Sequence, residues 1–68
     1  MQTITVNGID FDVLYDAARG GWRIVGSKRA GVRAQAAQAG LATTQTTDDQ
    51  GWIALVLSDP AAYGLEAS

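Results

Sequence analysis

The sequence predicts a small two-layer α+β domain, in which one alanine-rich helix packs on one face of an antiparallel or mixed sheet of about five strands. Three observations indicate this class: short segments with alternating apolar residues, one alanine-rich run at helical spacing, and turn residues between them. The expected order is β-β-β-α-β-β, and 68 residues (1–68) form a single domain. A chain this short buries only about 60% of the surface that its unfolded form exposes, so we expect marginal stability.

The N-terminal segment "TITVNGIDFDVLYD" predicts a β-hairpin. Asn7-Gly8 separates two alternating runs, and this dipeptide readily adopts the positive φ angles of a two-residue type I′ turn. The apolar residues of both runs fall on one face, and the aspartates fall on the other. The apolar set is Ile4, Val6, Ile9, Phe11, Val13 and Tyr15, and the polar set is Asp10, Asp12 and Asp16. We interpret the aspartates as a solvated outer face rather than as a cation or acid–base site.

The middle of the chain predicts a turn, a strand and the helix. "AARGG" is typical of a turn, and "WRIVG" is a third strand that begins at Trp22. Ser27 precedes the alanine-rich run and is expected to be the helix N-cap, because its hydroxyl can accept a backbone N–H bond. Gly40 is expected at C′, so the predicted helix spans residues 28 to 39.

Two more strands are predicted after the helix. "ATTQTT" is typical of an edge or partly exposed strand, and "DDQG" of a turn. "WIALVLS" gives the strongest strand signal, with its odd-numbered residues toward the core. Asp59-Pro60 then predicts one helical turn that Gly64 closes. Residues 65–68 are expected to form a frayed tail.

The composition excludes several kinds of chemistry. The chain has no Cys and no His, so a disulfide framework is impossible, and zinc, haem and iron–sulfur sites lose their usual ligands. The commonest general base and the best nucleophile are both missing, which predicts a protein without enzymatic activity, metal or cofactor. No signal peptide and no segment long enough to cross a bilayer is visible, so we expect a cytoplasmic protein with no membrane partner.

All five basic residues lie between residues 19 and 33, in a chain whose formal net charge is −2. Positive charge at a helix N-terminus opposes the macrodipole, which indicates that these charges serve a partner with an acidic surface. The predicted basic ridge consists of Arg23, Lys28, Arg29 and Arg33. The alternative, which ordinary surface chemistry favours, is pairing of this ridge with the hairpin aspartates Asp10, Asp12 and Asp16 across the sheet.

A second apolar set has the parity opposite to the core, and it consists of Leu14, Val25, Trp52 and Val56. One helix cannot cover both faces of the predicted sheet, so this set is expected on the open face. A large exposed apolar patch is typical of an interface with a partner or a second copy of the chain. The alternative is that the C-terminal segment with Tyr63 and Leu65 folds over this face.

In size and β-rich α+β character, the chain resembles small phage- or plasmid-encoded proteins that bind and block a host machine, such as anti-CRISPR proteins. The resemblance rests on no motif, so it gives no residue a role. It implies an inhibitor or accessory subunit of phage or mobile-element type that binds a host macromolecular machine.

Three functions follow from the residues. The missing catalytic side chains favour a non-enzymatic protein-binding module and leave a homodimer open. The alternative is a weak nucleic-acid or phosphate-backbone binding protein that uses the basic ridge, which the net charge opposes. A small enzyme built on carboxylates comes last.

Overall fold

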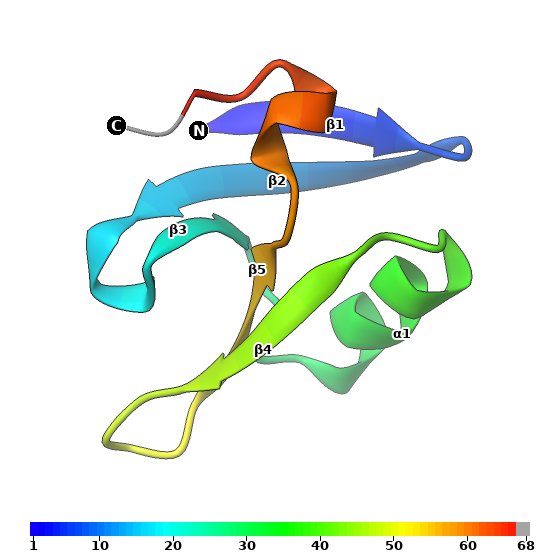
Figure 1. Cartoon of the computed structure of the whole chain (residues 1–68). Coiled ribbons are helices and arrows are strands. Elements are labelled where there is room, and N and C mark those ends of the chain that lie inside the picture. The colour runs from blue at the N-terminus through cyan, green and yellow to red at the C-terminus, as the bar shows by residue number, and fades with distance from the viewer. Residues whose placement is uncertain (67–68) are drawn as a thin grey trace.

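The computed structural model describes residues 1–66, which form a five-stranded sheet, one α-helix and two short 3₁₀ helices (Figure 1). The elements in order are β1 (Gln2–Val6), β2 (Ile9–Asp16), η1 (Ala17–Arg19), β3 (Gly21–Ile24), α1 (Ala30–Gln38), β4 (Thr43–Thr47), β5 (Ile53–Leu57) and η2 (Pro60–Tyr63). The sheet order is β1-β2-β3-β5-β4, and its neighbouring strands are antiparallel. The predicted α+β class and the β-β-β-α-β-β order are therefore confirmed. Among residues 1–66, no helix has the length and hydrophobicity needed to cross a membrane.

The first hairpin forms around Asn7-Gly8, as predicted. The two residues have φ angles of 50° and 82°, the positive values that a type I′ turn requires. The register sets Ile4 opposite Phe11, so the apolar side chains of β1 and β2 share one face of the sheet. The turn also contacts the end of the helix, because the Asn7 side-chain amide donates a hydrogen bond to the Ala39 carbonyl at 2.6 Å.

The core lies between the sheet and α1, which links β3 to β4 (Figure 1). Ala36 and Ala39 are almost fully buried, so the helical segment meets the sheet through methyl groups, as the alanine-rich sequence predicts. Gly40 follows with a φ of 72°, which confirms it as the C′ residue. The buried cluster comprises Ile4, Phe11, Val13, Trp22, Ile24, Ala36, Ala39, Leu41, Leu55, Leu57 and Leu65.

The helix begins later than predicted, and Ser27 is not its N-cap. A turn in which Gly26 has a φ of 82° precedes the helix, which begins at Ala30. Arg29 occupies the N-cap position and makes no side-chain cap hydrogen bond. Ser27 is buried instead, and its Oγ accepts the backbone N–H of Leu55 at 2.9 Å. The serine hydroxyl thus accepts a backbone N–H of the distant strand β5 rather than one of the helix that follows it.

The C-terminal segment packs against the core. Gly64 closes η2 with a φ of 72°, as predicted, and Leu65 then joins the core cluster at 5% exposure. The Glu66 carbonyl accepts the indole N–H of Trp22 at 2.8 Å. The prediction of a frayed tail at 65–68 is therefore wrong for its first two residues, because the apolar side chain of Leu65 is buried in the core. The last two residues lie outside the described residues. Tyr63 also packs against this cluster, so the segment lies on the core face of the sheet, and the alternative that Tyr63 and Leu65 fold over the opposite face is wrong.

Candidate functional site

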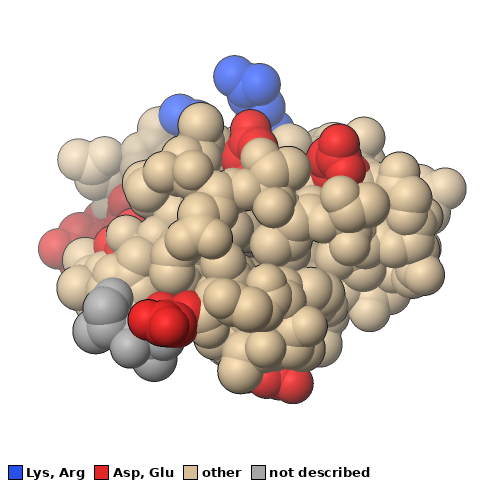
Figure 2. All heavy atoms as spheres, turned by 90° about the horizontal axis from the view of Figure 1, so that it is seen from above, with Lys and Arg blue, Asp and Glu red and all other residues tan. Residues whose placement is uncertain are grey.

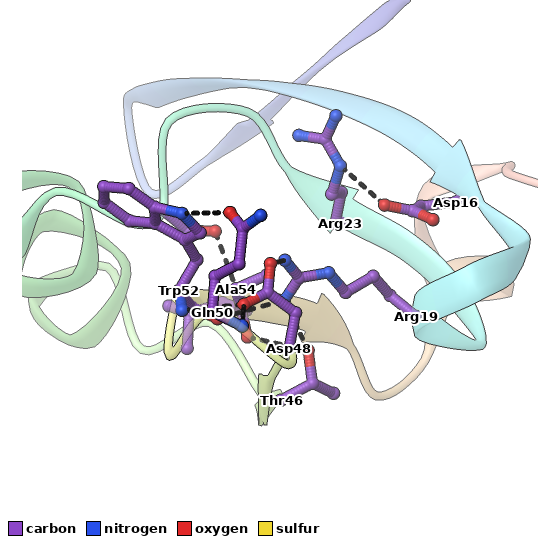
Figure 3. A network of polar contacts seen from close by, with 10 residues as sticks. Asp16, Arg19, Arg23, Thr46, Asp48, Gln50, Trp52 and Ala54 are labelled. Carbon is purple, nitrogen blue, oxygen red and sulfur yellow. Dashed lines mark hydrogen bonds and ion pairs between the residues drawn. The ribbon is translucent and has the colours of Figure 1, made fainter.

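A hollow of about 320 Å³ lies where β3, β5 and the β4–β5 turn meet, and Figure 3 shows the polar contacts around it. It brings together side chains from η1, β2, β3, the turn before α1 and the β4–β5 turn. These elements lie side by side because β3 pairs with β5 in the centre of the sheet. The polar and aromatic residues that line it are Asp16, Arg19, Arg23, Ser27, Lys28, Asp48 and Trp52.

Trp52 is the large aromatic residue of the hollow, and it is both exposed and fixed. Its exposed fraction is 49%. Its backbone N–H donates to Asp48 Oδ1 at 2.9 Å, and its indole N–H donates to Gln50 Oε1 at 3.0 Å (Figure 3). Lys28 Nζ lies 4.9 Å from the centroid of its ring, a cation–π contact that contributes about 0.5–1 kcal/mol at an exposed site. These contacts hold the indole in one orientation while much of its surface faces solvent.

Arg19 connects η1 to the β4–β5 turn beneath this tryptophan. Its Nη2 donates to Asp48 Oδ2 at 3.1 Å, and its Nη1 donates to Thr46 Oγ1 at 3.3 Å and to the Trp52 carbonyl at 3.4 Å (Figure 3). One carboxylate therefore orders the whole turn, because its Oδ1 also accepts the N–H of Gln50 at 2.9 Å. The aspartate of "DDQG" has the turn role that the sequence predicts.

Arg23 lies on the opposite wall of the hollow and pairs with Asp16. Its Nε donates to Asp16 Oδ2 at 2.9 Å, between neighbouring strands β3 and β2. Within residues 1–66, its Nη groups have no hydrogen-bond partner. In the part of the chain that the structure describes, the predicted pairing of the basic ridge with the hairpin aspartates is limited to this one contact, since Asp10 and Asp12 accept the hydroxyls of Thr5 and Thr3 instead.

The four residues of the predicted basic ridge have different surroundings in the structure. Arg23 and Lys28 line the hollow, whereas Arg33 Nη1 donates to the carbonyls of Ser27 at 2.9 Å and Lys28 at 2.8 Å. Arg29 is exposed at the helix start and does not line the hollow. Arg29 and Arg33 keep the one-turn spacing that the sequence predicts, because the Arg33 N–H donates to the Arg29 carbonyl at 3.3 Å, and the basic partner surface stays a prediction. Figure 2 shows basic side chains at one margin of the view, whereas acidic ones are scattered over it.

The second apolar set is exposed only in part. Leu14 is 38% exposed and Trp52 is 49% exposed, but Val25 is half-buried and Val56 is only 8% exposed. Val56 is therefore not a surface residue, contrary to the expectation. It packs against the backbone of β3 because Gly21 has no side chain, and a Cβ at that position would lie 3.2 Å from Val56 Cγ1.

The structure unites residues that the sequence placed in separate sets. Lys28 belonged to the basic set and Trp52 to the apolar set, and they meet in one hollow. Arg19 and Asp48 were not predicted to be site residues, although an arginine in a glycine turn and an aspartate pair in a second turn were visible. A fixed indole beside cations can receive an apolar group and an acidic group of the same ligand.

Comparison with protein-family models, with curated proteins and with solved structures finds no match to this chain. The chemistry of the site must therefore carry the functional conclusion, because a fold of this class hosts many functions.

Proposed function

We propose that this protein is a non-enzymatic protein-binding module, and that its partner docks on the hollow around Trp52. The observation that carries the proposal is the state of Trp52, which is 49% exposed and yet held by Asp48, Gln50 and Lys28. Tryptophan and arginine are enriched among the few residues that dominate binding energy at protein interfaces. A side chain that is already fixed loses little conformational entropy when a partner covers it.

The lining of the hollow favours a partner with an acidic surface. Three cations and two carboxylates line it, and one cation is the exposed Lys28 beside the indole. A partner that presents a carboxylate next to an apolar side chain would match both the charge and the aromatic surface. Such complementarity speeds association and excludes partners of the wrong charge.

The charge distribution favours a protein over a nucleic acid. A phosphate-backbone binder uses several free cations, each of which neutralises a phosphate. Here Arg19 and Arg23 already pair with carboxylates, Arg33 donates to backbone carbonyls, and the net charge is −2. An inhibitor or accessory subunit that acts on a cytoplasmic protein machine is the function that best suits these properties.

Affinity capture from the native cell tests the proposal. Tagged wild-type protein is compared with Trp52→Ala, Lys28→Glu and the control Gln38→Ala, whose side chain is exposed on α1 away from the hollow. We expect Trp52→Ala to weaken the free energy of binding to the partner by about 2 kcal/mol or more, which lowers the affinity more than tenfold and so reduces capture. Gln38→Ala should capture as the wild type does.

Each capture is repeated after nuclease treatment, and far-UV spectra confirm that the variants fold. Full capture by Trp52→Ala would contradict the docking site. Loss of all capture on nuclease treatment would show that the partner is a nucleic acid and not a protein.

A further inference from the structure

Strand β4 leaves one edge of the sheet open, and the hydrogen-bond pattern shows which of its residues face outward. Both hydrogen bonds that flank the β4–β5 ladder join even-numbered residues, Asp48 with Trp52 and Ala42 with Ser58, each at 3.1 Å. Hydrogen-bonded and non-bonded pairs alternate along antiparallel strands, so the even-numbered residues of β4 direct their backbone groups toward β5. The backbone N–H and C=O groups of Thr43, Gln45 and Thr47 therefore point away from the sheet.

This edge lacks the features that usually block strand pairing. Natural edge strands are protected by charged side chains, proline or bulges, and the sequence "TTQTT" of β4 contains no charged residue and no proline. The other edge strand, β1, differs, because its Thr3 and Thr5 hydroxyls donate to the carboxylates of Asp12 and Asp10 at 2.8 and 2.6 Å. These two hydroxyls already donate hydrogen bonds within the monomer.

The sequence of β4 reads the same in both directions, which makes the strand complementary to itself. An antiparallel pair of β4 strands centred on Gln45 sets this residue opposite itself and Thr43 opposite Thr47 of the second copy. In each of these pairs, the outward-pointing backbone N–H and C=O groups of one β4 strand face those of the other. A pair of this kind exchanges two hydrogen bonds, so the three pairs supply about six. The remaining contacts are Thr–Thr pairs, which are favourable between strands.

We propose that β4 pairs with β4 of a second copy of this chain about a two-fold axis through Gln45, so that two sheets become one continuous sheet. The proposal is independent of the partner surface around Trp52. One strand pair buries less than the roughly 800 Å² per partner of a standard stable interface, so we expect a weak dimer that dissociates on dilution.

Sedimentation velocity from micromolar to millimolar protein, with amide exchange measured by NMR, tests the proposal. We expect a concentration-dependent dimer and slower exchange of the Gln45 and Thr47 amides at high concentration. Gln45→Pro should abolish the dimer and preserve the fold, because proline removes an N–H that the monomer does not use. Gln45→Glu places two carboxylates across the axis and should weaken the dimer about tenfold or more.

The matched control is Thr5→Pro on β1. Val25 N–H donates to the Asp12 carbonyl at 2.8 Å, so even-numbered residues of β2 face β3 and the N–H of Thr5 points outward, as that of Gln45 does. This variant should dimerise as the wild type does. If Gln45→Pro fails to fold, Gln45→Glu alone decides the matter. A monomer at millimolar concentration, or a dimer that Gln45→Glu leaves unchanged, would overturn the proposal.

Discussion

Replacement of Ser27 by alanine should destabilise the domain through a single backbone amide. Ser27 is 2% exposed, and its Oγ accepts the N–H of Leu55 at 2.9 Å. In the described part of the chain, the register between β3 and β5 consists of the pair Arg23 and Val56. The Leu55 amide lies just beyond that pair, so the serine hydroxyl takes the place of a strand carbonyl where β3 turns away.

The magnitude follows from the loss of an acceptor in a buried place. A buried N–H that is left without a partner costs about 1–3 kcal/mol. The total free energy of unfolding of a domain of this size is roughly 3–10 kcal/mol, so the loss is a large fraction of it. For a small domain, each kcal/mol lowers Tm by about 4–8 °C, which gives a fall of roughly 4–24 °C.

Urea and thermal unfolding, followed by tryptophan fluorescence, measure this change. The matched control is Ser58→Ala, because Ser58 is exposed directly after β5 and should change stability by no more than about 0.5 kcal/mol. Amide exchange of Leu55 should accelerate in Ser27→Ala and not in Ser58→Ala. Equal stability of the two variants, with unchanged protection of the Leu55 amide, would refute the role given to the hydroxyl.

Two further substitutions test the turns. Gly8→Val should lower the midpoint of thermal unfolding, since φ is 82° there and the left-handed region costs an L-residue about 1–2 kcal/mol. An unchanged midpoint would contradict the positive φ angle assigned to residue 8. Arg33→Met should cost about 1–2 kcal/mol in urea unfolding, because it removes two hydrogen bonds to backbone carbonyls of the turn before α1. The control Arg29→Met should be close to neutral, and equal losses in both variants would contradict the role of Arg33.

The parts of the fold that the sequence predicted are those decided by neighbouring residues. Asn7-Gly8 sets the first turn through its own φ preferences, and Gly64 closes η2 in the same way. Ser27 shows the limit of such local signals. Its position before an alanine-rich run is typical of an N-cap, but Leu55, 28 residues along the chain, offers a buried N–H that the hydroxyl satisfies instead.

The site could be predicted only in pieces, because its contacts join distant segments. The sequence predicts Trp52 as part of an apolar surface and Lys28 as part of a basic one. The contact between their side chains depends on how the turn after β3 lies against β5. The pair of Arg19 and Asp48 spans 29 residues and has no local signature. The burial of Val56 likewise depends on the missing side chain of a glycine on the neighbouring strand.

The most direct test of the central claim, that a protein partner docks on the hollow around Trp52, is site-specific photo-crosslinking in the native cell. A photoreactive residue replaces Gln50, whose side chain contacts the indole N–H, and in a control protein it replaces the exposed Gln38 on α1. We predict a nuclease-resistant protein adduct from position 50 and none from position 38. Equal adducts from both positions, or a nucleic-acid adduct from position 50, would contradict the claim.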